Sequence, residues 1–295
     1  RYENADGDVW IGDFKDGALT GQGELIGIDG SHYRGQFNEW RFNGPGHLSL
    51  PDGSTYDGEF AADTYQGQGI LTLSDGTVQS GYWLNGQRVR DAKGAILPDP
   101  LELGLLNQGT LLNQALADVA PSTPAIELYS LVLAGDGKQS VFKREADYVS
   151  DMLTSRFGSR GRITLVNHRD HLLDRPMATR ENLHRAAKTL AERTGPEDLV
   201  FIYLTSHGTQ EHELVLDQPR MELADLPADE LAAALAPLKN RDKIIVISSC
   251  YSGGFIPALK DEKTLIMTAS QADRVSFGCS EEADFTYFGN ALFAQ

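Results

Sequence analysis

The sequence is poor in cysteine, in basic residues and in long apolar runs, and each shortage narrows what the protein can be. Its 295 residues include two cysteines, Cys250 and Cys279, too few for the disulfide framework of a small secreted domain. No apolar run approaches the roughly 18 residues that a membrane-spanning helix needs. With 26 basic and 42 acidic residues, the formal charge of −16 disfavours nucleic acid and anionic lipid as partners. We therefore expect no nucleic-acid partner and no membrane span in this chain.

What is present describes a soluble, folded protein with room for two domains. Hydrophobic residues make up 41% of the chain and charged residues 23%, which is the balance of globular proteins. No signal-like segment stands at the start. The chain begins at Arg1, part-way through a repeat, so we expect that it is truncated or processed there. Its compartment stays open between the cytoplasm and a periplasmic or secretory location.

One apolar segment leads directly to a cysteine. Residues 244–247 (IIVI) are too few for a helix and too uniformly apolar for a half-exposed strand, so they predict a strand buried on both faces. The strand ends in Ser248-Ser249-Cys250, and Gly253 and Gly254 then remove side-chain bulk. Cys250 is therefore expected at the carboxyl end of a core strand, where open α/β sheets bind their ligands.

A second apolar run, residues 199–205 (LVFIYLT), leads to Ser206-His207-Gly208 at what should be the same edge. A thiol and an imidazole at the ends of two parallel strands are the minimum needed for nucleophilic cysteine catalysis. Taken singly, a strand-end cysteine is usually a small buried hydrophobe, and a histidine there usually bonds locally. Their order and their glycine neighbours favour the catalytic interpretation. His212 is the one rival to His207, and it lacks the strand-end position.

These segments resemble the histidine and cysteine blocks of the caspase-like (clan CD) cysteine peptidases, most closely the legumain-type (C13) family, which includes the transamidase that attaches GPI anchors. The matching segments are residues 206–208 (SHG), 248–255 (SSCYSGGF), the strand at 265–269 and the segment at 276–279 (SFGC). The resemblance extends over about residues 126–295. It implies a caspase-like fold and cysteine endopeptidase activity on polypeptides, with no cofactor.

The resemblance also implies roles for individual residues. Cys250 would attack the scissile carbonyl to form an acyl-enzyme, and His207 would protonate the leaving amine and then activate water. Backbone N–H groups of Gly208 and Cys250 would hold the oxyanion, because glycine lets the chain come close. The asparagine that assists the histidine in this family has no clear counterpart, since Val141 occupies the approximate position. Cys279 would be a packed thiol near the site.

Substrate recognition is where the sequence departs from the family. The Arg-His pair of the family's specificity pocket is matched by Lys143 and Arg144, which would favour an acidic or amide side chain before the cleaved bond. A basic preference stays open, because Tyr251 and Asn290 replace the acidic residues that bind asparagine in legumain. A nearby serine of the family is likewise replaced, by Val275. Lys143 and Arg144 could also be solvated charges on a helix. The expected substrate-binding residues are Lys143, Arg144, Tyr251, Ser270 and Asn290.

The first part of the chain repeats itself every 23 residues. The repeated positions include the aromatic residues Trp10, Tyr33 and Tyr56 and the glycines Gly12, Gly35, Gly58 and Gly81. Alternating aromatic and polar residues predict half-buried strands, and pairs such as Asp75-Gly76 predict tight turns, so each unit should be a β-hairpin. The pattern resembles MORN repeats, which implies contact with a protein partner. A rigid spacer without a ligand would explain the same repeats.

Three segments follow from these patterns. Residues 1–87 should form the MORN-repeat hairpin array, 88–125 a linker with an amphipathic helix, and 126–295 the peptidase domain. In the last segment strands alternate with helices, which predicts a three-layer α/β sandwich. His168 and His171 lack further ligands at metal-site spacing, so we expect a solvated loop there and no metal site.

Three functions are compatible with the whole pattern. The leading one is a cysteine endopeptidase whose repeats recruit a partner or substrate. The second is a MORN scaffold with an inactive peptidase-like domain. The third is a transamidase that passes the same acyl-enzyme to an amine.

Overall fold

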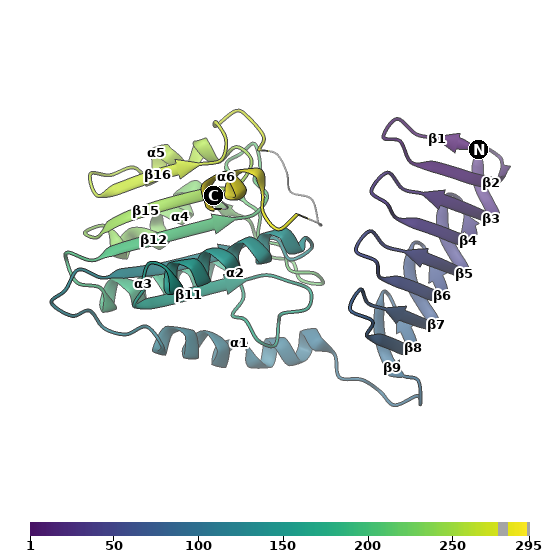
Figure 1. Cartoon of the computed structure of the whole chain (residues 1–295), viewed down its shortest axis with the longest axis horizontal. Coiled ribbons are helices and arrows are strands. Elements are labelled where there is room, and N and C mark those ends of the chain that lie inside the picture. The colour runs from purple at the N-terminus through teal and green to yellow at the C-terminus, as the bar shows by residue number, and fades with distance from the viewer. Residues whose placement is uncertain (277–282, 294–295) are drawn as a thin grey trace. The chain divides into compact units, whose positions relative to one another are not determined.

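A computed structural model describes residues 1–276 and 283–293 of the chain and divides it into two units, Arg1–Asp99 and Pro100–Gln295 (Figure 1). Cys279 lies outside the described residues. Each unit has a sheet and a hydrophobic core of its own. No helix in the described part of the chain combines the length and the apolar character that a membrane span requires.

The first unit is a single antiparallel sheet whose nine strands follow one another in chain order. The expected all-β hairpin array is thus confirmed. Each strand of one hairpin pairs with the next hairpin as well as with its own partner, so the sheet grows by repetition. The strands are β1 (Tyr2–Glu3), β2 (Val9–Lys15), β3 (Ala18–Ile26), β4 (His32–Asn38), β5 (Arg41–Ser49), β6 (Thr55–Ala61), β7 (Thr64–Thr72), β8 (Val78–Leu84) and β9 (Gln87–Asp91).

Aromatic rings lying on glycine pairs explain why both recur at the same spacing. Tyr33 is fully buried, and a Cβ at either Gly35 or Gly46 would overlap its ring and hydroxyl. The Tyr33 ring also stacks on Phe42, with ring centroids 3.7 Å apart and planes 9° from parallel. The next repeat has the same arrangement, so each unit supplies both the ring and the bare backbone that the ring covers.

The second unit is built on a five-stranded parallel sheet with the order β11-β10-β12-β15-β16. Every neighbouring pair is parallel, which requires the crossover helices that the alternating pattern predicted. The strands are β10 (Leu128–Ala134), β11 (Gly161–Val166), β12 (Leu199–Thr205), β15 (Asp242–Ser248) and β16 (Thr264–Thr268). A separate two-stranded ribbon joins β13 (Glu213–Leu214) to β14 (Leu226–Pro227).

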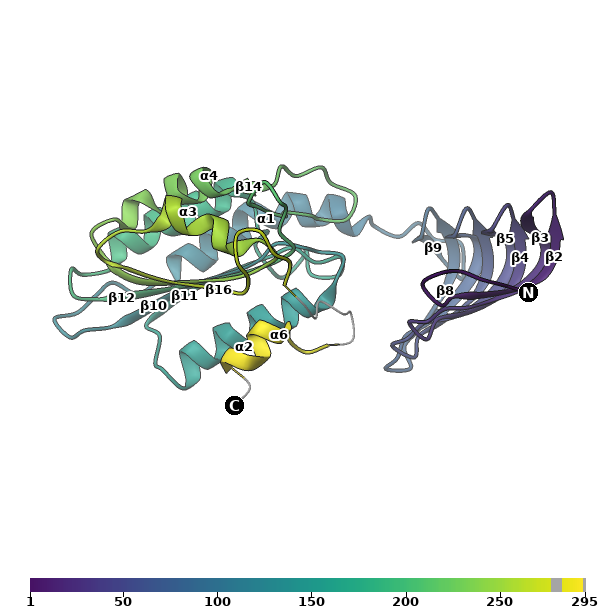
Figure 2. The ribbon, with the colours of Figure 1, turned by 90° about the horizontal axis from the view of Figure 1, so that it is seen from above.

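Helices cover both faces of this sheet, which confirms the α/β sandwich of three layers (Figure 2). One face carries α1 (Pro100–Ala117), α3 (Arg180–Arg193) and α4 (Ala228–Leu235), and the other carries α2 (Ser140–Ser155) and α6 (Tyr287–Phe293). Alternate residues of a strand serve the two layers, as Ile245 and Val246 do in β15. The remaining short helices are η1 (Ala236–Leu238), η2 (Ser252–Phe255) and α5 (Ile256–Leu259).

The helix expected in the linker is α1, and it is anchored to the second unit. The Gln108 side-chain amide donates to the carbonyl oxygens of Leu172 (2.9 Å) and Arg175 (3.0 Å), and its oxygen accepts from the Met177 N–H at 2.8 Å. At Gly104 a Cβ would lie 2.7 Å from the Leu172 Cβ, so glycine permits this close approach. The helix is therefore held at a fixed place beside β11.

His168 departs from the sequence expectation, because it lies buried and not in a solvated loop. Only 5% of its surface is exposed. Nδ1 accepts from the Asp170 N–H at 3.1 Å, and Nε2 lies 3.0 Å from the Ser140 hydroxyl. Both contacts suit a neutral ring. Burial is the main reason why the pKa of His168 is lowered from 6.5 to about 4. The nearby Asp170 charge raises this pKa, and the Arg169 and Lys143 charges lower it.

This buried ring should make stability depend on pH. Protonation favours the unfolded chain, so the free energy of unfolding should fall as pH drops from 6.5 towards 4, by about 3 kcal/mol from this group alone. The His168→Gln variant lacks that term. Urea titrations followed by the helix signal at 222 nm measure the free energy of unfolding of both forms. The amount by which the variant is less stable than the native chain should shrink between pH 7.5 and 4 by the contribution of His168 given above. His184→Gln, on the half-exposed side of α3, is the control; an unchanged deficit would contradict the assignment.

Candidate active site

The structure brings His207 and Cys250 to the same edge of the parallel sheet. Strands β12 and β15 are neighbours, and Thr205 is paired with Ser248 at their carboxyl ends. His207 and Cys250 each lie two residues beyond these paired positions. The Ser206 N–H continues the pairing past the strands by donating to the Ser248 carbonyl oxygen at 3.2 Å. The two segments therefore leave the sheet side by side.

Gly208 follows the histidine and packs directly on the cysteine segment. A Cβ at this position would overlap the Cys250 carbonyl oxygen and would lie 3.0 Å from the Ser249 hydroxyl. Glycine is required for this approach. Within the described residues, the backbone N–H groups of Gly208 and Cys250 have no hydrogen-bond acceptor. Two unused backbone donors are what an oxyanion would need.

Gln139 is a site residue that the sequence analysis missed. Its side-chain oxygen accepts a hydrogen bond from His207 Nε2 at 2.9 Å, and the ring also makes an edge contact with Phe142, with centroids 5.0 Å apart. The amide oxygen can only accept, so Nε2 is the donor of this hydrogen bond. Val141, at the position where the family has its asparagine, is instead fully buried in the core.

The start of α2 explains why Gln139 is available. It is the residue that caps this helix, yet its side chain makes no capping hydrogen bond because it reaches His207. Asp136 holds the turn in its place, since one carboxylate oxygen accepts the N–H groups of Lys138 and Gln139, both at 2.9 Å. The only sequence signal was the Asp136-Gly137 turn before the helix.

The cysteine is tied to the loop that follows β16. Cys250 is half-buried, and the Ser276 N–H points at its sulfur from 3.2 Å. Tyr251 adopts the left-handed conformation (φ +54°), a strain of roughly 1 kcal/mol for a non-glycine residue. Its N–H donates to the Arg274 carbonyl oxygen at 2.8 Å. These two hydrogen bonds set the position of the loop relative to the sulfur.

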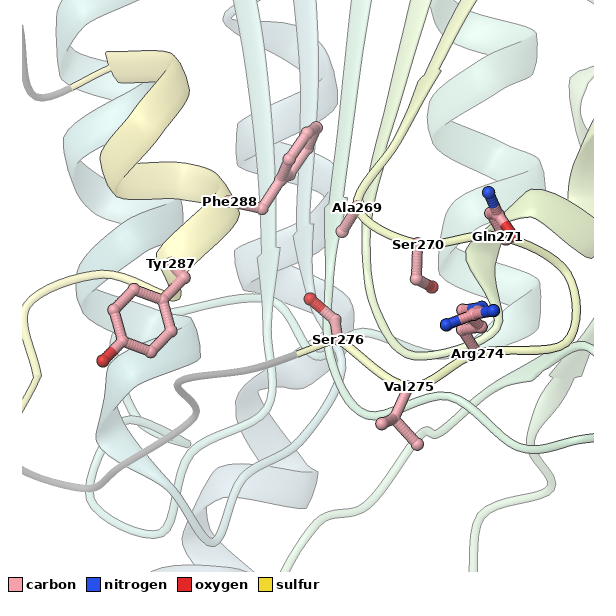
Figure 3. Close-up of a pocket in the computed structure, with 8 residues that line it drawn as sticks. All are labelled: Ala269, Ser270, Gln271, Arg274, Val275, Ser276, Tyr287 and Phe288. Carbon is pink, nitrogen blue, oxygen red and sulfur yellow. The ribbon is translucent and has the colours of Figure 1, made fainter.

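A pocket of about 440 Å³ lies beside this loop (Figure 3). Helix α6 supplies one wall, and the segment from residue 269 to residue 276 supplies the other. Ser276 belongs both to the lining and to the sulfur contact, so the pocket begins next to Cys250. The lining residues are Ala269, Ser270, Gln271, Arg274, Val275, Ser276, Tyr287 and Phe288.

Of the five residues expected to bind substrate, Ser270 lines this pocket. Its hydroxyl also donates to the Ser249 carbonyl oxygen at 3.1 Å. Tyr251 lies next to the sulfur and accepts a hydrogen bond from the Gln210 amide at 3.2 Å on its phenol oxygen. Asn290 is exposed on α6.

The two cations of the expected set, Lys143 and Arg144, are engaged elsewhere and are not among the lining residues. Lys143 forms an ion pair with Asp147 one helical turn away, at 2.8 Å. Arg144 donates to the Ala283 carbonyl oxygen at 2.6 Å and lies 3.7 Å from the Asp284 carboxylate. The first interaction lies within α2, and the second ties α2 to the segment before α6.

His212, the rival imidazole, packs on the segment after the nucleophile. A Cβ at Gly254 would overlap its ring, which explains the second glycine of the Ser-Gly-Gly sequence. His212 has φ +62°, and its buried Nδ1 has no hydrogen-bond partner among the described residues. No three histidine, cysteine or acidic side chains gather as metal ligands in the part of the chain that the structure describes.

A fully buried carboxylate, Glu145 of α2, lies beneath the site and joins α2 to β12 and to the start of α6. It accepts hydrogen bonds from the hydroxyls of Tyr203, Thr205 (2.8 Å) and Thr286 (2.9 Å) and from the Thr286 N–H (2.7 Å). Burial first, and the charge of Glu145 second, raise the pKa of Tyr203 well above its usual value, which keeps this phenol a donor. A Cβ at Gly289 would overlap the carboxylate, so glycine lets α6 dock.

Comparisons with known proteins concern the family of the chain. The model of the Peptidase C13 family matches residues 128–191 and 181–295, and that of the MORN repeat matches residues 10–32, 33–55 and 56–78. Among solved structures, the crystal structure of caspase-1 from Spodoptera frugiperda is similar over 57% of this chain and 67% of its own, with 13% identity and a TM-score of 0.40. A search of curated proteins finds no match.

Proposed function

Because the chain belongs to the peptidase C13 family, we propose that it is a cysteine endopeptidase that cleaves polypeptides through Cys250 and His207. The observation that carries the proposal is the pairing of Thr205 with Ser248, which delivers the imidazole and the thiol to one sheet edge. Family membership supports the class of reaction, and the register supports the identity of the two reacting groups.

Each step of the reaction has a group of this chain behind it. His207 Nδ1 takes the thiol proton, and the Cys250 sulfur attacks the scissile carbonyl carbon. The N–H groups of Gly208 and Cys250 bind the oxyanion, each with an effect of roughly 3 kcal/mol on the barrier. His207 then returns the proton to the departing amine, which leaves a thioester on the sulfur. Water, deprotonated by His207, attacks the thioester carbonyl carbon, and the C–S bond breaks to release the acid product. His207 then returns the proton to the Cys250 sulfur.

Gln139 is proposed as the positioning residue of this mechanism. By accepting the Nε2 proton at 2.9 Å it fixes the tautomer in which Nδ1 is the base. The edge contact with Phe142 limits rotation of the ring. A side chain that acts in this way changes the chemical step more than substrate binding.

Replacing Gln139 should therefore separate positioning from mere packing. Gln139→Ala should lower kcat about 10- to 100-fold with KM nearly unchanged, because the ring loses its orientation. Gln139→Glu keeps the acceptor and adds a charge that favours the imidazolium, so the limb of the pH–rate profile that belongs to His207 should move to higher pH. Steady-state kinetics between pH 5 and 9 measure both effects.

The matched controls are Gln114→Ala and Gln114→Glu, on the exposed side of α1. They should leave kcat and the profile as in the native chain. A Gln139→Glu profile that coincides with the native one would show that Gln139 only packs.

The repeat sheet is proposed to bind a protein partner of the peptidase. Its polar face, opposite the stacked rings, carries a hollow of about 730 Å³. Two contacts cross the hollow between neighbouring strands: an ion pair from Arg34 to Glu24 at 2.9 Å and a hydrogen bond between His47 and Asp57 at 2.6 Å. Fixed polar groups over bare glycine backbone support recognition of a polypeptide in preference to an anionic lipid surface.

The proposed activity is tested by incubating the native chain and its Cys250→Ala variant with a peptide library and identifying the new termini by mass spectrometry. Fragments that appear only with the native chain support the endopeptidase. A library left intact by both would favour the inactive scaffold.

A further inference from the structure

The pocket beside Cys250 contains one charged side chain, Arg274, among its described lining residues. Its guanidinium has no carboxylate or other hydrogen-bond partner in the described part of the chain; only its backbone groups are used, with Tyr251 and Gln271. In a chain of net charge −16, a cation left without a partner beside a nucleophile is available to a ligand.

The loop geometry links this arginine to the reacting centre. Its carbonyl oxygen accepts the Tyr251 N–H at 2.8 Å, and Ser276, two residues further on, donates its N–H to the Cys250 sulfur at 3.2 Å. A residue whose carbonyl carbon meets the sulfur therefore has its side chain within reach of the pocket. The residue before the cleaved bond is the one in that position.

The remainder of the lining suits a short anionic side chain. The Ser276 hydroxyl and the Gln271 amide can donate hydrogen bonds, while Ala269, Val275 and Phe288 are apolar. None of the described lining residues is acidic, so none of them would compete for the guanidinium or attract a basic side chain.

We propose that Arg274 binds the carboxylate of the residue that precedes the cleaved bond, so that the peptidase cuts after aspartate or glutamate. The guanidinium fork matches a carboxylate with two parallel hydrogen bonds, which an amide side chain cannot reproduce. Specificity would then come from the loop after β16 (Thr264–Thr268), and not from Lys143 and Arg144. This inference rests on the proposed endopeptidase function.

The test is a set of fluorogenic peptides that differ only in the residue before the cleaved bond, which is Asp, Glu, Asn or Lys. At pH 7.5 the native chain should have a kcat/KM for the Asp or the Glu peptide, whichever is higher, at least tenfold above that for the Asn peptide. The Lys peptide should have the lowest kcat/KM. Arg274→Gln should lower kcat/KM for the acidic peptides 10- to 100-fold and change the Asn value less than threefold. Arg274→Glu should raise the kcat/KM for the Lys peptide above that for the Asp peptide.

The control is Arg162→Gln, an exposed arginine of β11 (Gly161–Val166) that pairs with Asp151 at 2.7 Å, and it should keep the native ranking. Equal losses on all four peptides in Arg274→Gln, or a native preference for Asn or Lys, would overturn the assignment of Arg274 while leaving the endopeptidase in place. Failure of the native chain to cleave any peptide, including the library above, would instead count against the proposed function itself.

Discussion

Replacing Cys250 by alanine should lower kcat/KM for peptide cleavage by about 10⁴-fold or more, the loss seen when a covalent nucleophile is removed from a site whose other groups remain. The reason is that the variant has no atom that can form the acyl-enzyme, while the neighbouring N–H groups of Gly208 and Cys250 stay in place. Fluorogenic peptide assays on the two forms measure the ratio.

The chain offers a matched control, because it has one other cysteine, Cys279. Cys279→Ala should retain the native rate and should still react with a peptidyl acyloxymethylketone, with the adduct located on Cys250 by mass spectrometry. Thermal unfolding should coincide for the three forms to within a few degrees, since the sulfur makes only weak contacts with Ser276. Cleavage by Cys250→Ala within tenfold of the native rate would rule out this sulfur as the nucleophile.

The elements could be predicted because their apolar runs are continuous and their ends are marked. The run at 199–205 coincides with β12, and the run at 244–247 lies inside β15 (Asp242–Ser248). Thr179, a residue type preferred at the start of helices, accepts the Asn182 N–H as the capping residue of α3. In the repeats, the aromatic and glycine positions recur with the same period because the rings pack on the glycines. The sequence pattern therefore already indicated these contacts.

The site was only partly predictable, because its remaining contacts join segments far apart in the chain. Gln139 meets His207 across 68 positions, and nothing near either residue indicates the pairing. His168 looked like a charged surface loop because its neighbours are polar, yet the chain folds Ser140 and Gln218 over it. Arg274 lies in a polar turn, and the order of the strands in the sheet brings this turn close to Cys250. Local pattern predicts strands and their ends, and packing decides which side chains meet there.

A second large effect is expected from Glu145→Ala, which should lower the free energy of unfolding of the second unit by about 4 kcal/mol. The substitution leaves the hydroxyls of Tyr203, Thr205 and Thr286 and the Thr286 N–H without their common acceptor, and it opens a cavity between α2, β12 and α6. Unpartnered buried groups cost roughly 1–3 kcal/mol each where water cannot reach them. Because α6 carries Tyr287 and Phe288, loss of its anchor should also raise KM.

The chain allows the two units to be followed separately in one experiment. All three tryptophans, Trp10, Trp40 and Trp83, belong to the first unit, whereas every described helix belongs to the second. Glu145→Ala should lower the midpoint of the 222 nm transition by about 10 °C and leave the tryptophan fluorescence transition where it was. Glu192→Ala, an exposed glutamate on α3, should move neither transition. If the 222 nm midpoint of Glu145→Ala fell by less than about 2 °C, the carboxylate could not be what holds α6 against the sheet.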